Sequence, residues 1–542
     1  MRSLFNSSNI RRLLLIFLLY LSTALFVTYP LLNHFSTHVP IGSESSGTVP
    51  FLNLWILKWN LAQFSDLFSN YWNAPILYPS TGVFAFSEPQ PLAGIILIPF
   101  RSLNPAALYN SLMVIYMVAN AASAYMLLRY TKVSISLALL GGLWVQLLPF
   151  LTHERGVIQL QPVFPLLLTL LASFYLFKNP DWKRAILVAL SIAATFYLSE
   201  NYGLIIAIAL VPFAPYSIRY SRRLTALFIL AGLSAIMLTL PLIIPQLNIL
   251  EEHNFVRAEK SIEVGSASVL DYLTPSKTIV SSSLSHFETT KFGLYPGIGI
   301  MLLGILGAFR SHKNEKLADV ASPLALSLLL CFLLSLGLNL NIFDLRPYDL
   351  IVERVPGFSH LRSPFRFGIW VQLSLVIYGV HFLNDLRLEK YYRPLLLVAF
   401  FISFELLPLP ARLTEVPSSF VLEGIQSPAV FLPYVQGTSA TAYTQTTRYM
   451  LTAQDSEITI VNGYSGYLPA ANAELKRLFA NFPDSASLGE MEEIGVSTIL
   501  IVEDWMTVDQ QAEIDRFIDH GQISEQGAQA GFLVYEIVRI QP

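Results

Sequence analysis

Several ionisable side chains stand at the ends of long apolar segments, where they are costly unless they are paired, hydrated or functional. Glu44, in "GSESSG", is the single acid of its surroundings and follows the first apolar segment. Its carboxylate can accept a proton from a hydroxyl group; the plain alternative is an exposed loop acid. Trp55 and Trp59 follow with helical spacing. We treat both as candidate substrate contacts, although tryptophan is also common at membrane surfaces.

A short connection between two apolar segments, "THER", consists almost entirely of His153, Glu154 and Arg155. His153 and Glu154 are candidate ligands for a divalent cation, and Glu154 is also a candidate catalytic acid or base. Arg155 carries a guanidinium group that can bind a phosphate through two parallel hydrogen bonds. A local ion pair at the membrane surface is the alternative.

Two further acids occupy comparable places. Glu88, in "FAFSEPQPL", directly precedes a short apolar stretch, so it is either a site residue or a carboxylate that stabilises a helix N-terminus. Glu200, beside Asn201, lies at a tight turn between two apolar segments. If the Glu200 side chain faces solvent, it has no special role; if it faces inward, it is a candidate site residue. We keep both as candidate substrate-binding residues.

Two arginines, Arg362 and Arg366, stand immediately before a late apolar segment in "FSHLRSPFRFGIW". The topology derived below puts them on the outer side of a membrane, where basic residues are under-represented. Fixed guanidinium groups there suit a phosphate or pyrophosphate. Side chains that extend to lipid headgroups are the alternative.

The composition places these residues in a membrane protein. Of 542 residues, 54% are hydrophobic and only 13% are charged, and the mean hydropathy is +0.53. A soluble domain carries about 25% charged residues, so we predict a multi-pass protein whose first partner is the lipid bilayer. The net charge of −3 gives no basis for nucleic-acid binding. The single cysteine, Cys331, excludes a disulfide framework within the chain.

Apolar runs of about 20 residues predict about eleven transmembrane helices. They lie near residues 13–30, 106–128, 133–152, 159–177, 185–199, 202–218, 224–243, 294–309, 320–338, 367–384 and 394–410. The stretch 91–100 is too short to cross and reads as a re-entrant or interfacial helix. The fold class expected is therefore an α-helical polytopic bundle.

The distribution of lysine and arginine predicts the orientation, because basic residues concentrate in cytoplasmic loops. Arg11 and Arg12 precede the first span, and alternate connections carry further basic residues: Arg129, Lys132, Lys178, Lys183, Arg184, Arg219, Arg222, Arg223, Arg310, Lys313, Lys316, Arg387, Lys390 and Arg393. We expect a cytoplasmic N-terminus in the plasma (inner) membrane and an extracytoplasmic C-terminus.

The last part of the chain differs from the rest. Residues 1–410 form the predicted transmembrane domain, with a large first outer loop at 31–105. From about residue 411 apolar runs shorten and charge density rises. "VSTILIVED" and "GFLVYEIVRI" are typical of strands, "AELKRLFANFP" and "DQQAEIDRFIDHG" of amphipathic helices, and "EITIVNGYSGYLP" of a strand that ends in a turn. We therefore expect a small α/β domain at 411–542, outside the membrane, that can cover a site.

The predicted topology brings the acids and arginines to the outer face of the bundle, beneath the C-terminal domain. A carboxylate beside arginines at a lipid surface suits a reaction on a lipid-linked phosphate. The carboxylate takes the proton of an acceptor hydroxyl, and the arginines stabilise the phosphate that leaves. On this interpretation Glu44 is the base.

Three segments around these residues resemble the GT-C superfamily of membrane glycosyltransferases: "TYPLLNHF…NLWILKWN", "YPSTGVFAFSEPQPL" and "GFSHLRSPFRF". The C-terminal "RYMLTAQDSEITIVNGYSGYLP" and "FPDSASLGEMEEIGVSTILIV" also resemble the extracytoplasmic domain of its poorly characterised bacterial members. The resemblance implies an inverting transfer of a sugar from a polyprenyl-phosphate donor to an extracytoplasmic acceptor. It also implies a base in the first outer loop, the loop of Glu44, where relatives have an aspartate in a "GDxxD"-like context.

The resemblance adds, in some members, an acidic or metal-binding motif in the loop that holds His153 and Glu154. A divalent cation, Mg²⁺ or Mn²⁺, is thus an open cofactor, and no other cofactor is expected. Two alternatives to a transferase remain. A lipid or polysaccharide transporter predicts acids and prolines within spans, where this chain has only His381 and Glu405, with Pro241 and Pro245 near a span end. A non-catalytic assembly protein predicts that the outer cluster is dispensable.

Overall fold

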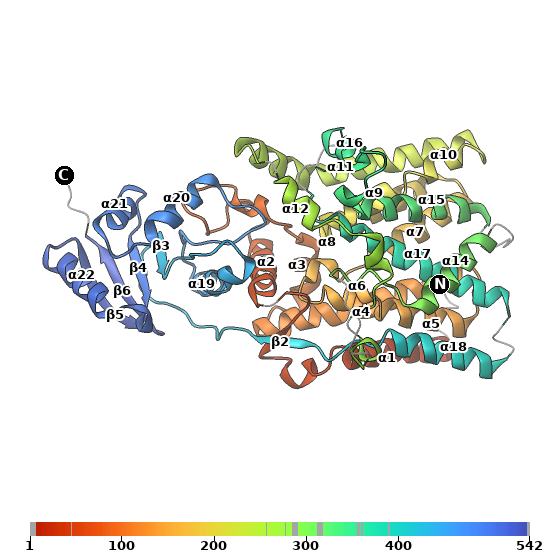
Figure 1. Ribbon diagram of the computed structural model, residues 1–542, viewed down its shortest axis with the longest axis horizontal. Helices are drawn as coiled ribbons and strands as arrows, with labels where there is room; N and C mark the ends of the chain where they lie inside the picture. Colours follow the sequence, from red (N-terminus) through yellow and green to blue (C-terminus); the bar gives the residue numbers. More distant parts are fainter. Residues whose placement is uncertain are drawn as a thin grey trace.

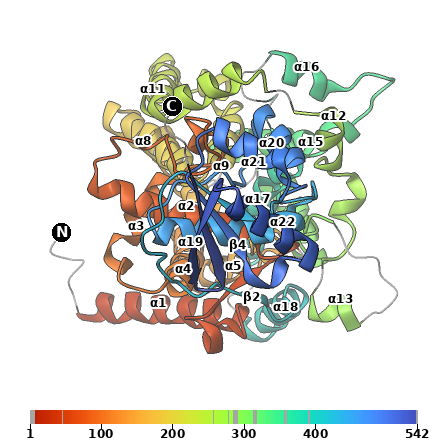
Figure 2. The same ribbon diagram turned by 90° about the vertical axis from the view of Figure 1, so that its left-hand side faces the viewer.

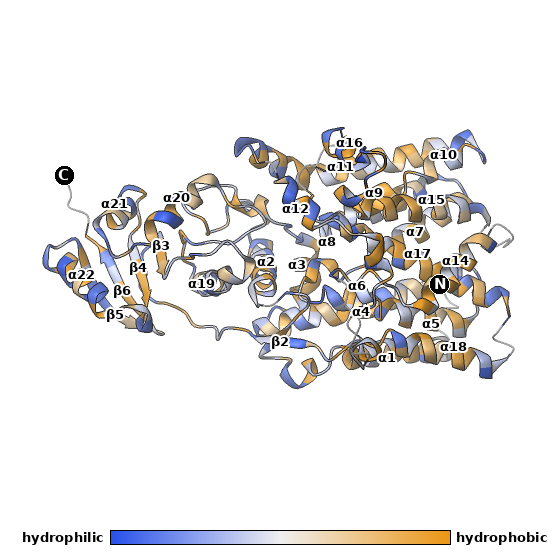
Figure 3. Cartoon of the chain, in the orientation of Figure 1, coloured by the Kyte–Doolittle hydropathy of each residue, from blue (hydrophilic) through white to orange (hydrophobic). Residues whose placement is uncertain are grey.

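Long apolar helices make up most of the computed structural model, and a smaller α/β unit projects from one end of their bundle (Figure 1). The structure describes residues 7–44, 46–255, 257–276, 278–283, 291–311, 318–354, 358, 361–387 and 391–538. Lys313, Lys316 and Lys390, used above to predict orientation, lie outside these residues. In Figure 3 the apolar colour dominates the bundle, whereas the C-terminal unit is mixed.

The bundle follows the predicted apolar runs. Its main helices are α1 (Ser7–Val27), α4 (Pro105–Tyr130), α5 (Ile135–Gln146), α6 (Pro149–His153), α7 (Phe164–Lys178), α8 (Trp182–Leu198), α9 (Glu200–Ala209), α10 (Phe213–Ser217), α11 (Arg222–Glu252), α14 (Ile298–Arg310), α15 (Ala318–Ser335), α17 (Gly368–Asp385) and α18 (Tyr392–Glu405). Continuous apolar residues favour these helices, and α11 and α15 continue through internal prolines, Pro241 and Pro245 in α11 and Pro323 in α15.

Six helical segments within the described residues are long and apolar enough to cross a membrane: Ile10–Val27, Pro105–Tyr130, Ile135–His153, Ile158–Lys178, Arg222–Glu252 and Pro364–Asp385. Each coincides with a predicted span, which confirms a multi-pass membrane protein. The five other predicted spans correspond to shorter helices, among them α8, α14 and α18. The stretch at 91–100 forms α3 (Pro91–Leu97) and a 3-10 turn, Ile98–Phe100, too short to cross.

The tightest helix pair, α14 and α17, depends on glycine. A Cβ atom on Gly307 would lie 2.6 Å from the backbone carbonyl carbon of Tyr378, and one on Gly304 would lie 2.7 Å from the carbonyl oxygen of Leu375. Because backbone atoms cannot rotate away, only glycine allows the two helices to approach this closely. Gly232, on α11, has no atom within 4 Å of the same position.

Gly307→Ala should therefore destabilise the purified protein by about 1–3 kcal/mol, since the added methyl overpacks a helix contact. Gly232→Ala is the matched control, and it should be neutral or slightly stabilising because alanine favours helix. Thermal unfolding in one detergent compares the two. Equal melting temperatures for both variants would contradict the close approach of α14 and α17.

The first outer loop carries the elements that reach the C-terminal unit. It contains β1 (His38–Ile41), α2 (Thr48–Ser65) and the 3-10 turn η2 (Val83–Phe86). β1 pairs antiparallel with β2 (Arg412–Glu415), with His38 opposite Glu415. α2 packs against α3 on one side and α19 (Thr444–Asp455) on the other. The loop is therefore a layer between the bundle and the C-terminal unit (Figure 1).

Two further outer loops surround this layer. One contains α12 (Glu259–Val264), the 3-10 turn η5 (Val269–Tyr272) and α13 (Ile279–Ser283). The other contains η7 (Gly337–Asn339), α16 (Pro347–Arg354) and η9 (Pro364–Phe367). Seen along the long axis, α12, α13 and α16 lie around the rim of the bundle, outside the sheet of the C-terminal unit (Figure 2).

The C-terminal unit contains a four-stranded sheet in the order β3-β4-β6-β5. The strands are β3 (Ala429–Leu432), β4 (Thr498–Val502), β5 (Ile523–Gln529) and β6 (Phe532–Ile537), and the helices are α19, α20 (Ala470–Phe479), α21 (Ser485–Glu493) and α22 (Val508–Asp519). β3 and β4 run parallel, and the other neighbours run antiparallel. This is an α/β arrangement.

Four of the predicted C-terminal segments are confirmed: β4, β6, α20 and α22. The strand predicted in "EITIVNGYSGYLP" is wrong, because that segment makes only an isolated bridge, between Ile460 and Ala429, and then runs as a loop. β3 was not predicted, since its four residues are too few for an alternating pattern. β5 was also missed; its sequence, "ISEQGAQ", is polar and pairs through its backbone at the sheet edge.

Candidate functional site

Arg366 lies beside two carboxylates from separate segments, Glu88 and Glu154, and each of these has a second carboxylate near it. Nη1 of Arg366 lies 3.9 Å from Oε1 of Glu88. The positive charge of Arg366 also lowers the pKa of Glu154, whereas the charge of Glu44 raises it. The charge of Glu88 raises the pKa of Glu200. We call Glu44, Glu88, Glu154, Glu200 and Arg366 the carboxylate cluster.

Backbone contacts hold the loops of Glu44 and Glu154 together. The amide of Ser43 donates a hydrogen bond to the carbonyl oxygen of His153, at 2.8 Å. A Cβ atom on Gly42 would lie 2.7 Å from the amide nitrogen of Arg155, so the strand can cross this turn only with glycine. Two loops that are more than a hundred residues apart in the sequence thus meet backbone to backbone.

The other two carboxylates are positioned at the N-terminus of α9. The Ser199 hydroxyl caps that helix and donates a hydrogen bond to Oε2 of Glu88, at 3.4 Å. Glu200 is the first residue of α9, and the Gln246 side chain hydrogen-bonds with it. Oε1 of Glu200 is buried and has no hydrogen-bond partner in the described part of the chain. The tight turn at Glu200 therefore faces inward.

Burial dominates the protonation of the cluster. It raises the pKa of Glu154 to about 7, against the opposing effect of Arg366. It also raises the pKa of Glu88 to about 7, again opposed by Arg366. Burial raises the pKa of Glu200 well above its usual value. Carboxyl groups that titrate near neutral pH are suited to proton transfer, and they are characteristic of functional sites.

Glu200→Gln should raise the melting temperature at pH 8 and leave it unchanged near pH 4. The pKa of Glu200 is higher in the folded than in the unfolded chain, because burial disfavours the charged form. The stability from this carboxyl group is therefore complete below its unfolded pKa and is lost as the pH rises. Glutamine removes the charge and keeps the shape.

The matched control is Glu492→Gln, an exposed acid on α21. Its melting temperature should equal that of the wild type at both pH values. If Glu200→Gln melts lower than the wild type at pH 8, the charged form of Glu200 stabilises the fold and the assignment is wrong.

Two more arginines lie beside the cluster. Arg362 is exposed, and its charge lowers the pKa of Arg257 in addition to the larger effect of burial, to about 10. Both guanidinium nitrogens Nη1 and Nη2 of Arg257 donate to the carbonyl oxygen of Gly466, at 3.3 and 3.2 Å. Tyr464 is close enough for its pKa to respond to both Arg362 and Glu44. Sequence analysis missed Arg257, although it is a basic residue in an outer loop like Arg362.

A loop of the C-terminal unit, residues 463–467, covers this region. The Ser465 and Ser87 hydroxyl oxygens are 2.6 Å apart, next to Glu88. The ring of Tyr467 lies 5.0 Å from that of Phe86 and 4.1 Å from that of Phe255. This cover loop, as we name residues 463–467, joins the first and a later outer loop over the cluster. The C-terminal unit therefore contributes residues that cover the site.

Three predicted site residues lie away from the cluster. Arg155 is buried and donates to the carbonyl oxygen of Val27 at the end of α1, at 3.3 Å. Burial lowers the pKa of Arg155 to about 10. Trp55 and Trp59 are stacked, with ring centroids 6.4 Å apart, and are buried at 2% and 8% exposure. The structure places these three side chains in packed interior positions.

The cation predicted at His153 and Glu154 has few ligands in this structure. Nε2 of His153 lies 3.8 Å from Oε1 of Glu154. Among the described residues, no three or more His, Cys, Asp and Glu side chains lie together so that they could hold a metal ion. Mg²⁺ usually takes only one or two protein ligands and completes its coordination with waters and substrate phosphate. The cation at His153 and Glu154 therefore stays a prediction.

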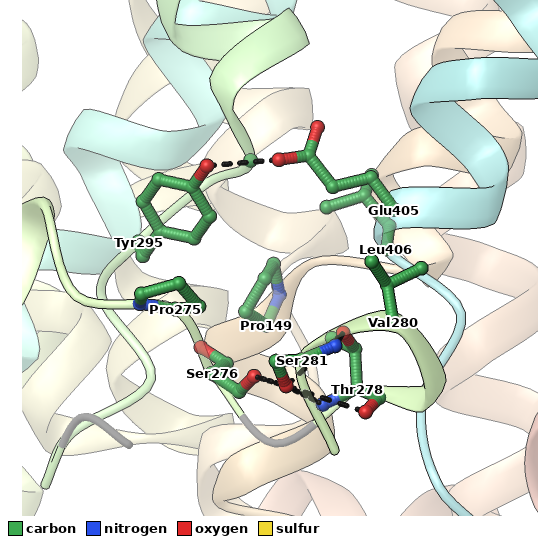
Figure 4. Close-up of a pocket in the computed structure, with 10 residues that line it drawn as sticks. Pro149, Pro275, Ser276, Thr278, Val280, Ser281, Tyr295, Glu405 and Leu406 are labelled. Atoms are coloured by element: carbon green, nitrogen blue, oxygen red, sulfur yellow. Dashed lines mark hydrogen bonds between the residues drawn. The ribbon is translucent and has the colours of Figure 1, made fainter. Parts of the chain in front are cut away.

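A separate cavity of about 170 Å³ lies near the outer ends of α14 and α18, lined by residues that include Pro149, Ser276, Tyr295 and Glu405 (Figure 4). Glu405 accepts hydrogen bonds from the Tyr295 hydroxyl at 2.8 Å and from the Ile298 amide at 2.7 Å. This carboxylate therefore caps α14. Because its acceptors are engaged structurally, the cavity is a poorer candidate for chemistry than the carboxylate cluster.

His381, the other titratable residue noted within a span, lies 2.9 Å from the hydroxyl of Thr131 through its Nε2 atom. It is buried, at 3% exposure, within α17. Both titratable residues expected from the transporter alternative thus take part in local hydrogen bonds between neighbouring helices.

Comparison with solved structures finds similar chains. The Archaeoglobus fulgidus oligosaccharyltransferase in the apo form matches with TM-score 0.46 and 12% identity, over 90% of this chain and 69% of that chain. The same protein tethered to an acceptor peptide matches with TM-score 0.46 and 12% identity, over 94% and 71%. The arabinofuranosyltransferase AftD from Mycobacteria matches with TM-score 0.50 and 12% identity, over 97% of this chain but only 41% of that chain.

At this identity the likeness to AftD shows the fold alone, a GT-C-like membrane fold, as the sequence resemblance predicted. No curated protein matches the chain. One family model, described as a domain of unknown function, DUF6311, matches residues 67–404. That range covers more than half of the chain and includes most of the bundle together with Glu88, Glu154, Glu200 and Arg366. The chain belongs to the DUF6311 family.

Proposed function

We propose that this protein is a membrane glycosyltransferase that moves a sugar from a polyprenyl-phosphate donor to an acceptor outside the cytoplasm. The observation that carries the proposal is that Arg366 lies beside Glu88 and close to Glu154, with Glu200 and Glu44 as the neighbours of those two acids, beneath the cover loop. Scattered capping or surface acids would have no reason to meet. The similar fold of AftD, named as an arabinofuranosyltransferase, supports the same reaction class.

The proposal includes a topology. All eleven apolar runs cross the plasma (inner) membrane, and the shorter helices α8, α14 and α18 do so with local thinning of the bilayer. The N-terminus is cytoplasmic. Residues 1–410 form the transmembrane domain, and residues 411–542 form the extracytoplasmic α/β domain that contributes the cover loop. The carboxylate cluster then lies at the outer surface, where a lipid-linked donor presents its phosphate.

Glu44 is the proposed base. It is less buried than Glu154, so it is the better placed of the two to meet an acceptor hydroxyl. The acceptor oxygen attacks the anomeric carbon of the donor sugar, a new C–O bond forms, and the bond from that carbon to the phosphate oxygen breaks. The hydroxyl proton passes to the Glu44 carboxylate. Polyprenyl phosphate leaves with the bonding electrons, and this single displacement inverts the anomeric centre.

The arginines stabilise the leaving phosphate. Arg366 is held within the cluster by Glu88, and its Nε atom is buried without a hydrogen-bond partner among the described residues. Arg257 and Arg362 supply two further positive charges that form no salt bridge with a described carboxylate. Oriented donors aimed at developing negative charge are a principal source of catalysis. Glu154 and Glu88, with pKa values of about 7, can gain or lose a proton near neutral pH, so the negative charge beside the phosphate can change.

The proposal is tested by profiling envelope glycans and lipid-linked sugars in a deletion strain of the source organism. The strain is complemented with the wild type, with Glu44→Gln and with Glu154→Gln at matched protein level. We expect a glycan to disappear on deletion and to return with the wild type only. Loss of a general base typically lowers the rate about 10²–10⁴-fold. Glu492→Gln is the matched control and should restore the glycan fully.

Each outcome separates the alternatives. Full restoration by Glu44→Gln but not by Glu154→Gln would move the base to Glu154. Full restoration by both would show that the cluster is dispensable, as a non-catalytic assembly protein requires. Loss of the glycan together with lipid-linked sugar that accumulates on the cytoplasmic face would favour a transporter.

The arginines make a second prediction in the same strain. Arg366→Gln should lower glycan formation by at least about tenfold, because a hydrogen bond to a charged group is worth about 1.5–3 kcal/mol. Arg362→Gln and Arg257→Gln should each have a smaller effect that Arg→Lys at the same position partly restores. Arg516→Gln, an exposed arginine on α22, is the control. Wild-type glycan levels with all three arginine variants would refute phosphate binding here.

A further inference from the structure

An exposed apolar turn projects from the outer loop between α15 and α17. We call residues 341–346 the Phe343 turn. Phe343 is 101% exposed, and its neighbours Ile342 and Leu345 are 46% and 55% exposed. Three large apolar side chains on one exposed turn are unusual for a loop in water, where turns favour small and polar residues.

The turn is ordered by its own hydrogen bonds. The amide of Ile342 donates to the carbonyl oxygen of Leu345 at 2.9 Å, and the amide of Leu345 donates back at 3.0 Å. Phe343 and Asp344, the two residues between them, have φ angles of +51° and +64°. Such two-residue turns normally use Asn-Gly, because a bulky residue with positive φ is strained. An aromatic ring is thus held at the tip despite a conformational cost.

The base of the turn is fixed to a second outer loop. Nη1 of Arg346 lies 2.5 Å from Oε1 of Glu259, the first residue of α12. η7, which directly precedes the turn, packs against α12 and α16. The segment before the turn is thus packed against α12 and α16, and the residue after it is paired with Glu259. Because both ends of the turn are fixed, the Phe343 side chain stays directed away from the protein.

The turn lies where a membrane surface is expected. η7 follows α15 directly, so the turn starts a few residues beyond the outer end of that apolar helix. Figure 2 shows the chain before α16 extending sideways past the outline of the bundle, away from the C-terminal unit. A sideways projection at the outer end of a span runs along the bilayer surface. Aromatic residues are enriched at this level, where their rings meet the headgroup region.

We infer that the Phe343 turn inserts into the outer leaflet and binds the boundary between lipid headgroups and acyl chains. The rings and methyl groups of Ile342, Phe343 and Leu345 enter the apolar region, and Asp344 and Arg346 stay among the headgroups. The same loop continues to Arg362 and Arg366. Insertion would therefore fix the height of these arginines relative to the membrane. The inference does not depend on the transferase proposal.

Site-directed spin labelling of the full chain in phospholipid nanodiscs tests this insertion. Nitroxide is attached at Phe343→Cys, and the control label is at Val508→Cys, an apolar residue 87% exposed on α22 of the C-terminal unit. The native Cys331 is fully buried, and labelled wild-type protein measures its background. Collisions with oxygen, which partitions into lipid, are compared with collisions with a water-soluble nickel complex.

The label at Phe343→Cys should have an oxygen-to-nickel collision ratio severalfold above that of the label at Val508→Cys. Equal ratios, or a higher ratio at Val508→Cys, would overturn the inference. Because the Phe343 side chain is fully exposed, its replacement should not change the stability of the fold. The melting temperature of the labelled protein should therefore equal that of the wild type, and it is measured alongside. Phe343→Asp should return the loop to water: a label at Leu345→Cys should lose its high ratio in that background, and retention of the ratio would also overturn insertion.

Discussion

The outer end of this bundle is organised by the confinement of several carboxylates with one closely placed arginine. Negative charges that are removed from water repel one another and are expensive unless they are neutralised. Here Arg366 neutralises part of the charge, and raised pKa values at Glu88 and Glu154 allow protons to neutralise more. Ser199 and Gln246 satisfy further oxygen atoms. The loops that carry these residues are held in place by glycine contacts, helix caps and backbone hydrogen bonds, so the arrangement resists relaxation.

The sequence alone indicated the membrane class, the principal apolar helices and, as candidates, all five residues of the carboxylate cluster. It could do so because long apolar runs and isolated charges at their ends are local signals. Arg155 illustrates the limit: its neighbours in "THER" reach the cluster, whereas its own side chain turns to the end of α1. Trp55 and Trp59 likewise have the spacing of a helix, but the spacing cannot reveal that both faces of α2 are covered. Arg257 and the cover loop depend on contacts between segments about two hundred residues apart, for which one sequence holds no pattern.

The molecule consists of two kinds of segment, closely packed apolar helices and polar loops. The helices are joined by close contacts such as those of Gly304 and Gly307, and the chain as a whole is similar in fold to AftD at 12% identity. The outer loops differ in length and carry the polar residues. Loops tolerate change more readily than packed helices, so the loop layer is the part of this architecture that can change while the bundle is kept.

The pairing of β1 with β2 has a consequence for the biogenesis of the protein. β1 leads to Glu44, near the start of the chain, and β2 begins at Arg412, whose guanidinium group donates to the carbonyl oxygen of Glu44 at 2.9 Å. During synthesis the Glu44 loop emerges hundreds of residues before its partner strand exists. The loop must therefore wait in an unpaired form until the last apolar segment has been inserted and β2 has followed it. A partly made chain consequently holds its acidic loop without the strand that orders it, and the site is completed only in a molecule whose membrane insertion is finished.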